Sequence, residues 1–468
     1  TGIGYYALGA NTTGQENVAV GSLALDANTT GSENVAFGDH SLTSNTTANN
    51  NTALGRSALL SNTTGSPNTA VGHQAMRQNT TGLYNTAVGK DAFYANTTAE
   101  HGTAIGHQAL LANTTGNNNV AVGSEALAAN TTASDNVAVG TEALKVNTTG
   151  TRNTATGDNT LKANTTGSWN SAVGANSLKA NTTGNYNCAF GDQSLLVNTT
   201  GLNNVAMGYN SLVANTTGSY NTAVGHLALR LNTTANSSVA FGYDALQGST
   251  GANNTGIGTS ALVSVSSGTD NVGIGKHSGK DITSGYKNIC IGENTIIGAA
   301  DGNNRIVIGS GLQSAGANTV TFGKLTGSSR VYNVYTSNAT WIRVSDQRVK
   351  KDITTNTDCG LAFINDLRTV TYKFKAPSEL DPSLSEYDAD NNTPSHDKKM
   401  YGFVAQEVKA ALDSHNITDF NGWHKIEEGE DKFESISYEM FVMPLVKAIQ
   451  ELSAKNEALL TRIEALEG

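Results

Sequence analysis

Polar and apolar residues follow one another along the first part of the chain in a pattern that repeats every seventeen residues. An Asn-Thr-Thr triplet recurs in this step from Asn11 to Asn232, and a glycine keeps the same step from Gly4 to Gly242. Later copies drift, and one residue is lost around 248–251. A repeat this regular predicts one structural unit stacked on copies of itself rather than a disordered, low-complexity segment.

Each repeat carries two apolar columns separated by the recurring glycine. Val18-Ala19-Val20 alternates with a period of two, which predicts a strand with both valines on one face and Ala19 on the other. The glycine permits a turn that a Cβ would hinder, and abundant Thr, Asn, Gly and β-branched residues disfavour helix. We therefore predict a β-solenoid with one coil per repeat and a thin core made by the two columns. The columns contain Val20, Phe37, Leu54, Val71, Val88, Ile105 and Val122, and Leu25, Leu42, Leu59, Met76, Phe93 and Leu110.

The small residue on the opposite strand face (Ala19, Ala36, Ala53, Ala70) predicts a second close contact, made with neighbouring chains. We therefore expect a homotrimer wrapped about a common axis. The repeat resembles the head domains of trimeric autotransporter adhesins, whose shorter coils also carry an Asn-x-Val/Ala-Ile/Val-Gly strand. Stacked at roughly 4.8 Å per strand, about nineteen coils would give a rod on the order of 90 Å long.

The Asn-Thr-Thr triplets match the acceptor sequence for N-glycosylation more than a dozen times. A structural interpretation is favoured, because Asn and Thr at one position of every coil can form stacked hydrogen-bond ladders and satisfy backbone groups in the turns. We expect ladders here, not sugar attachment.

Composition and charge exclude several classes of function. The 468 residues are too many for one ordinary core, so we expect at least two units. A formal net charge of −10 argues against a nucleic-acid partner, and no window of eighteen consecutive apolar residues predicts membrane insertion. The chain opens in mid-repeat at Thr1, so we expect a further region upstream and draw nothing from the missing targeting signal.

Neither a cofactor nor a metal site is expected. Cys188 and Cys290 fall on strand positions and are interpreted as small apolar residues, and Cys359 lies far from both. His73, His107 and His226 share one column but are several coils apart; a metal site would need ligands closer together.

The turn position just before the strand asparagine holds Tyr84, Arg152, Trp169, Tyr186 and Tyr220 in one column. Exposed aromatic rings on a long rod could stack on the sugar rings of a host-surface receptor, or they could pack laterally on neighbouring turns. Both interpretations stay open. No coil carries the clustered Asp or Glu that hydrolysis of a glycan requires, so depolymerase activity is poorly supported.

The repeat ends near residue 323, after which Lys, Arg and helix formers become common. We predict short strands at 330–335 and 340–344, a helix at 360–368, a strand at 369–374 and a polar loop from 377 to 399. The predicted domains are 1–323, the solenoid shaft; 324–344, a β transition segment; and 345–468, a small α+β domain whose terminal helix covers about 439–467.

Three blocks carry a resemblance over 345–468. They are Ser345-Asp346-x-Arg348-x-Lys350; Tyr401-Gly-Phe-Val-Ala-Gln-Glu-Val408; and Ile436-Ser-Tyr438 leading into Met443-Pro-Leu-Val-Lys-Ala-Ile-Gln-Glu-Leu452. In this order, behind a β-rod, they resemble the C-terminal intramolecular chaperone and auto-processing domain of phage endosialidases, tailspikes and long tail fibres.

The resemblance implies that the domain gathers three chains, lets the β-structure fold and then cuts itself off with a Ser-Lys dyad. The dyad maps to Ser345 and Lys350. Asp346 and Arg348 match the same motif and would orient the site. Gln406 and Glu407 match the second block, where a structural role is equally open.

The chemistry of such a dyad is reasonable in its own right. A serine hydroxyl needs a base, and a lysine serves if burial or nearby cations lower its pKa from about 10.4 towards neutrality. A serine beside the scissile bond can attack an adjacent carbonyl of its own chain, so cleavage would be single-turnover. Taken alone, Ser345-Asp346 would be read as an ordinary turn or helix N-cap.

The terminal helix shows a heptad seam. Ile and Leu alternate in it with one asparagine, a composition that by itself favours a two-stranded coil. We nevertheless expect a trimer, because the shaft predicts one and the short seam could pack on its own domain. The seam contains Leu445, Ile449, Leu452, Asn456, Leu459, Ile463 and Leu466.

The sequence therefore predicts a trimeric structural fibre with a self-cleaving serine endopeptidase and no other catalytic activity. We expect a segment of a phage or prophage tail fibre or tailspike, carried on the virion and recognising a glycan or protein on the host surface. A bacterial surface adhesin with the same chaperone is the alternative, and a glycan depolymerase is the less favoured third.

Overall fold

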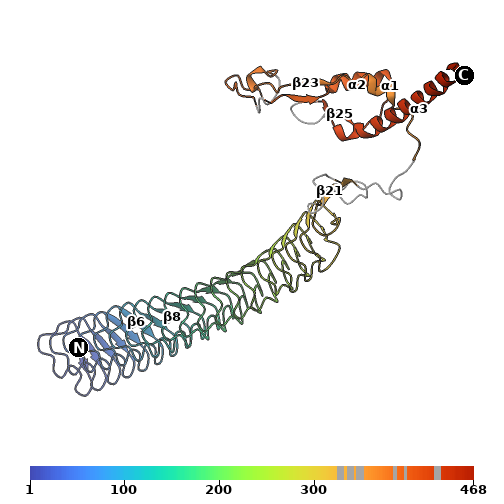
Figure 1. Ribbon diagram of the computed structural model, residues 1–468. Helices are drawn as coiled ribbons and strands as arrows, with labels where there is room; N and C mark the ends of the chain where they lie inside the picture. The colour runs from blue at the N-terminus through green and yellow to red at the C-terminus, as the bar shows by residue number, and fades with distance from the viewer. Residues whose placement is uncertain are drawn as a thin grey trace. The chain divides into compact units, whose positions relative to one another are not determined.

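The structure of the protein is a computed structural model. It describes residues 1–323, 331–334, 353–382, 387–394, 398–425 and 434–467, and the backbone of 342–343. The chain forms two compact units, Thr1–Val349 and Lys350–Gly468 (Figure 1).

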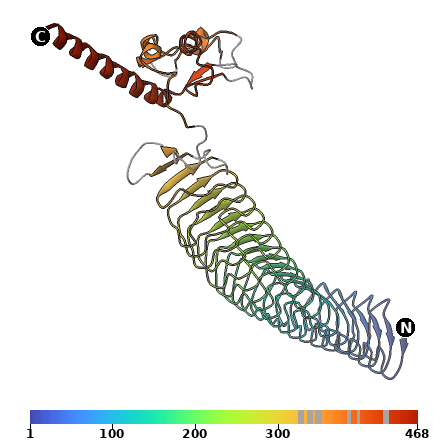
Figure 2. The same ribbon diagram turned by 90° about the vertical axis from the view of Figure 1, so that its right-hand side faces the viewer.

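The first unit is a β-solenoid, which confirms the predicted fold class. Each coil contributes one short strand, and successive strands pair side by side, as Figures 1 and 2 show for a gently curved stack. The strands are β1 Gly2–Ile3, β2 Val18–Val20, β3 Val35–Phe37, β4 Thr52–Leu54, β5 Asn68–Val71, β6 Asn85–Val88, β7 Thr103–Ile105, β8 Val120–Val122, β9 Val137–Val139, β10 Thr154–Thr156, β11 Ser171–Val173, β12 Cys188–Phe190, β13 Val205–Met207, β14 Thr222–Val224, β15 Val239–Phe241, β16 Thr255–Ile257, β17 Val272–Ile274, β18 Ile289–Ile291, β19 Ile306–Ile308 and β20 Thr319–Phe322.

The pairing from β1 to β20 is parallel and keeps the repeat in register. Val18 lies opposite Val35, seventeen residues on, and the pattern continues coil by coil. Where the sequence loses a residue the offset falls to sixteen, so that Val239 pairs with Thr255 and no strand is lost. The last strand then turns back: β20 pairs antiparallel with β21 (Val331–Val334), which pairs with β22 (Ile342–Arg343).

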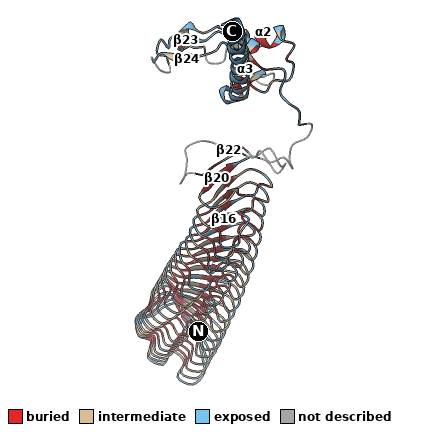
Figure 3. Ribbon diagram, turned by 45° about the vertical axis from the view of Figure 1, so that its right-hand side comes forward, coloured by how far each residue is buried: buried red, intermediate tan, exposed pale blue. Residues whose placement is uncertain are grey.

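The inside of each coil is lined by the alanine column, not by the Val20 column, so this part of the prediction was wrong. Ala19 and Ala36 are fully buried, whereas 38% of Val18 and 53% of Phe37 are exposed. The Leu25 column is buried as predicted. Figure 3 shows the buried residues following the strands along the solenoid.

The reason is the narrowness of the coil. At Gly256 and Gly273, which replace alanine in two coils, an added Cβ would lie 3.0 Å from the Cγ of Leu246 and 2.6 Å from the Cγ of Leu262. A leucine of the buried column therefore reaches across to the strand. In these two coils it leaves no room even for a Cβ, and in most of the other coils alanine is the residue that fits. Valine and phenylalanine must face outward.

The asparagine ladders are confirmed. Within the first ladder, Asn28 Nδ2 donates to Asn11 Oδ1 at 2.8 Å, and Asn45 Nδ2 donates to Asn28 Oδ1 at 2.9 Å. A second ladder runs along the strand asparagines, where the Asn34 backbone N–H donates to Asn17 Oδ1 at 3.0 Å. Asn28 and Asn45 are fully buried, which argues against sugar attachment and leaves the triplet as a structural element.

Two backbone features shape the turns of every coil. The recurring glycine has a positive φ (136° at Gly21), and a Cβ there would lie 2.5 Å from the carbonyl oxygen of Gly38 in the next coil. The buried leucine is left-handed as well, with φ of 52° at Leu25 and 50° at Leu42. Left-handed leucines cost energy locally, so the stacking of identical turns must stabilise them.

The second unit has a small α+β fold, with elements close to those predicted from its sequence. Strand β23 pairs antiparallel with β24, and β25 pairs antiparallel with β26. The elements are α1 Leu361–Asn365, β23 Val370–Tyr372, the 3-10 helix η2 Pro377–Glu379, β24 Met400–Gly402, α2 Ala405–Ser414, β25 Trp423–Lys425, β26 Glu434–Ile436, the 3-10 helix η3 Tyr438–Phe441 and α3 Val442–Glu467.

Only the start of α3 packs on this unit. Pro444 and Ala448 are its buried residues, whereas 65% of Ile449, 56% of Leu459 and 79% of Leu466 are exposed. The idea that the heptad seam packs on its own domain is therefore wrong for most of its length. Among the residues that the structure describes, the unit therefore leaves most of the seam exposed.

Candidate functional site

The second and third sequence blocks meet in one aromatic cluster. The backbone N–H of Phe403 donates to the hydroxyl of Tyr438 at 3.0 Å, and the two rings stack with centroids 5.8 Å apart. The ring of Phe441 packs on the rings of Phe403 and Phe420, with centroids 5.3 and 5.1 Å away. Residues about thirty-five positions apart in the chain are thus held in one frame.

Sterics explain why the second block has a glycine at residue 402. A Cβ at Gly402 would collide with the Tyr438 hydroxyl. Because that hydroxyl must approach the backbone to accept the hydrogen bond from Phe403, the block needs a residue without a side chain here. The Gly-Phe pair and the tyrosine therefore form a single packing unit.

Glu407 is engaged in a two-point ion pair. Arg368, just after α1, donates through Nε to Glu407 Oε2 at 2.9 Å and through Nη2 to Oε1. These hydrogen bonds lower the pKa of the Glu407 carboxyl and raise the pKa of Arg368. Gln406 is exposed on α2. These contacts give Glu407 a structural role, since they hold α2 to the segment that follows α1. Nothing in the sequence around Arg368 indicated that it would be the partner of Glu407.

A second carboxylate ties the long helix to α1. Glu451 accepts the backbone N–H of Leu361 at 2.8 Å and pairs with Lys447 at 3.4 Å. The hydrogen bond from Leu361, with a smaller contribution from Lys447, lowers the pKa of the Glu451 carboxyl. Gly360 fits under this contact, because a Cβ there would lie 2.5 Å from the carboxylate.

An apolar hollow of about 270 Å³ lies beside the aromatic cluster. Its lining includes Leu367, Phe403, Phe441 and Leu445, so the first seam residue of α3 borders it. Of the described residues that line the hollow, Tyr438 is the titratable one, and its hydroxyl already accepts the hydrogen bond from Phe403. We therefore interpret the hollow as part of the packing around the aromatic cluster.

The predicted catalytic pair, Ser345 and Lys350, lies outside the described residues, as do Asp346 and Arg348. The Ser-Lys dyad therefore stays a prediction from the sequence. What the structure adds is the frame that follows it, from α1 to α3.

The turn column of the shaft is a surface of stacked side chains. The Arg152 Cζ atom lies 4.4 Å from the centroid of the Trp169 ring, and Trp169 stacks on Tyr186 with ring centroids 6.2 Å apart. Tyr84 stacks on His101 at 5.0 Å. Lateral packing therefore occurs, yet 47% of Trp169 and 60% of Tyr220 remain exposed. Exposed ring area is left for a ligand, so glycan contact stays a prediction.

The column that follows the recurring glycine also stacks. His226 lies between Tyr209 and Tyr243, with ring centroids 5.4 and 5.3 Å away. Among the described residues, no group of three His, Cys, Asp or Glu side chains is placed to hold a metal ion. Cys290 is fully buried, and desolvation raises the pKa of its thiol to about 12.

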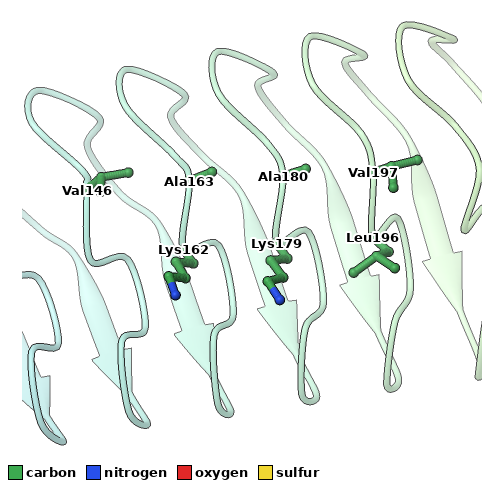
Figure 4. Close-up of a pocket in the computed structure, with 7 residues that line it drawn as sticks. All are labelled: Val146, Lys162, Ala163, Lys179, Ala180, Leu196 and Val197. Carbon is green, nitrogen blue, oxygen red and sulfur yellow. The ribbon is translucent and has the colours of Figure 1, made fainter.

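The side of the solenoid opposite the strands, here called the return face, is formed by the residues between the Leu25 column and the first asparagine ladder. A groove of about 530 Å³ crosses it (Figure 4). Lys162 and Lys179 point the same way along it, beside Ala163 and Ala180. Lys162 bonds to Glu142, which Lys145 also contacts at 2.7 Å.

No helix among the described residues is long and apolar enough to cross a lipid bilayer.

The fold and its frame define a fibrous β-solenoid followed by a small α+β unit with a long, uncovered terminal helix. Residues 345–417 match the family model described as chaperone of endosialidase, which covers the first two sequence blocks. Neither the curated proteins nor the solved structures contain a match to the chain. Solenoid and chaperone segment together support a fibre- or tailspike-like trimeric protein.

Proposed function

We propose that the chain is a segment of a phage or prophage tail fibre or tailspike, carried on the virion, that recognises the host surface. Its C-terminal unit gathers three chains and then releases itself by cutting next to Ser345. The observation that carries the proposal is the chaperone-of-endosialidase match at 345–417 directly behind a solenoid whose last parallel strand is β20.

Three chains have a physical reason to meet through α3. The helix presents Leu452, Leu459 and Ile463 at 48%, 56% and 48% exposure. Burying such a seam between helices is the ordinary way to stabilise it. Holding three chain ends together beside the last coil would let the solenoid fold from that end, one coil on the next.

A chaperone is useful because the coils are so alike. Chains that slip by one coil would keep most strand and ladder contacts, since each coil carries nearly the same residues. A clamp at one end excludes such slips while the shaft forms. Removing the clamp afterwards leaves a rod that unfolds slowly.

The proposed cut uses two side chains of the chain itself and one water molecule. The Ser345 hydroxyl attacks the carbonyl carbon of a neighbouring peptide bond, and the neutral Lys350 amine takes the hydroxyl proton. As the C–N bond breaks, that proton passes to the leaving nitrogen, and water then hydrolyses the ester left on the serine. No cofactor takes part in these steps.

The test compares the expressed chain with Ser345→Ala and Lys350→Met by denaturing gel and mass spectrometry. The parent should yield two fragments that meet next to residue 345, and both variants should stay whole. Thr355→Ala removes an exposed hydroxyl nearby and should be cut like the parent. An uncut parent, or a Ser345→Ala chain cut at the parent's rate, contradicts the processing.

Trimer assembly is tested separately in the uncut Ser345→Ala background. Ile463→Asp places a charge in the seam and should reduce the trimer measured by sedimentation. Thr461→Asp places the same charge on another exposed face of α3 and should leave the trimer intact. A parent that sediments as a dimer or monomer contradicts the trimer.

The stacked rings of the turn column are the proposed glycan contact. Trp169→Ala and Tyr186→Ala should weaken binding to host polysaccharide on a glycan array, because sugar faces stack on exposed rings. Tyr243→Ala, in the other stacked column, is the matched control. Equal signals for Trp169→Ala and the parent would contradict the proposed sugar contact and favour a protein receptor.

A further inference from the structure

The described strands of the solenoid carry one long surface that is free of charge and largely apolar. This surface, the outer strip, consists of the two columns that flank the buried Ala19 column on the strands, one containing Val18 and the other Val20. Exposure within it reaches 53% at Phe37 and 57% at Phe241. Strand pairing is unbroken from β2 to β20, so the strip is continuous along the shaft.

Charge is absent from the outer strip. From β2 to β20, all of which the structure describes, neither column contains an Asp, Glu, Lys or Arg. Thr156 is the one polar residue in the Val20 column, whereas the Val18 column alternates between aliphatic residues and eight threonines or serines, so the strip is apolar along one edge and mixed but uncharged along the other. Charged side chains appear at once beside it, as at Asp39 and Arg56. Fifteen per cent of the chain is charged, so this exclusion follows one surface rather than the overall composition.

The area of the outer strip is that of a stable interface. With two outward residues per strand it is roughly 10 Å wide and about 90 Å long, hence on the order of 900 Å². Specific interfaces take about 800 Å² from each partner, so the strip is large enough for one. The return face offers no such surface, because Lys145, Lys162 and Lys179 interrupt it.

We propose that the outer strips of three copies of this chain face one another along the trimer axis, with the return faces outward. The inference rests on the proposed trimer and assigns its shaft interface. Another copy is the occupant that fits, because it offers a charge-free strip of equal length. The alanine column, expected from the sequence to make this contact, is fully buried inside each coil.

The outer strip also marks the axial register. A closed rotation axis places equivalent residues of the copies at equal height. Phe37, Phe190, Phe241 and Phe322 lie on β3, β12, β15 and β20, so they are separated by nine, three and five coils. Because all distances among them differ, any slip aligns at most one phenylalanine level and sets the others against smaller residues.

Cys188 supplies a native probe of this geometry. It lies on β12 in the Val18 column, partly exposed and free, two residues before Phe190. Cys290 and Cys359 are buried and should react slowly. In the trimer the three copies of Cys188 would lie near the axis at one height, within reach of a short bis-maleimide.

The experiment treats the purified full chain with this reagent and reads cross-linked species on a denaturing gel, while sedimentation gives the oligomeric state. The expected result is extensive cross-linking that Cys188→Ser abolishes. The control is Ala180→Cys on the return face in the Cys188→Ser background, which should not cross-link. A trimer that links through residue 180 and not 188 overturns the strip and keeps the trimer. A monomer overturns both.

The register marks are tested with Phe190→Val and Phe241→Val together. The double variant should remain trimeric but lose Cys188 cross-linking several-fold, as slipped chains separate the thiols by one or more coils. Val173→Ala with Val224→Ala removes bulk from the same column without touching a phenylalanine and should cross-link like the parent. Undiminished cross-linking in the phenylalanine variant overturns the register role.

Discussion

The ring of Phe93 occupies the space that a side chain at residue 102 would need: a Cβ on Gly102 would lie 2.7 Å from the Phe93 Cζ atom. Phe93 stands in the Leu25 column, and Gly102 stands where other coils have the strand asparagine. The next coil has the usual pair, Leu110 and Asn119, both fully buried. A gain of volume on one side of the coil is therefore matched by a loss on the other.

This relationship predicts a compensating pair of substitutions. Gly102→Asn alone should overpack the coil and lower the free energy of unfolding by about 1–3 kcal/mol. Phe93→Leu in the same chain should recover most of that loss, because it recreates the pair of the next coil. Thermal melting of the parent, both single variants and the double variant gives the coupling. Additive effects would contradict direct packing between the two positions.

The first asparagine ladder predicts a large cost for a small truncation. Asn62→Ala removes the donor to Asn45 Oδ1 at 3.0 Å and leaves that buried oxygen without this partner, whereas the Gly65 carbonyl keeps its hydrogen bond from Asn51. Each buried acceptor without a partner costs about 1–3 kcal/mol. Thr64→Ala in the same triplet alters an exposed side chain and should melt like the parent. Equal melting temperatures for the two variants would show that the ladder adds little.

The ion pairs of Lys145 and Lys162 with Glu142 predict a pH dependence. Hydrogen bonds from Lys145 and Lys162 lower the pKa of the Glu142 carboxyl from 4.5 to about 2. The folded state therefore prefers ionised Glu142, a preference fully present above pH 4.5 and lost as the pH falls towards 2. Glu142→Gln should be less stable than the parent near neutral pH, and the difference in urea midpoint should shrink across this window. A constant difference would point to another cause.

The contact between Gly402 and the Tyr438 hydroxyl predicts how the C-terminal unit responds to substitution. Gly402→Ala should lower both the melting temperature and the fraction of chain cut next to Ser345, because the frame behind the site is displaced. Tyr438→Phe loses one hydrogen bond, worth about 1 kcal/mol. The double variant should recover part of the processing lost in Gly402→Ala. A double variant no better than Gly402→Ala would place the defect elsewhere.

Much of the fold could be predicted from period and residue type, because one coil repeated many times shows its strand, its turn glycine and its ladder in every copy. Which face of the strand points inward could not be predicted in this way. Alternation places Val18 and Val20 together but does not say which side is inside, and the choice depends on how far Leu25 reaches across the coil. The left-handed φ of Leu25 was also unforeseen, since leucine disfavours it in isolation.

In the C-terminal unit, the second and third sequence blocks contain Phe403 and Tyr438, but neither the aromatic frame that they form nor the contacts that brace it were predicted. Arg368 with Glu407, and Leu361 with Glu451, join residues 39 and 90 positions apart, and such pairs leave no local pattern. The roles of Ser345 and Lys350 rest on the first block and the family match.

The solenoid accepts a missing residue between β15 and β16 without losing a strand pair. Since each strand pairs only with the one before and the one after it, a whole coil could be added or removed as a cassette. Every such change would lengthen or shorten the shaft by about 4.8 Å and leave the chemistry at both ends untouched. Tandem duplication or deletion within a gene could therefore tune how far the fibre reaches in small, even steps.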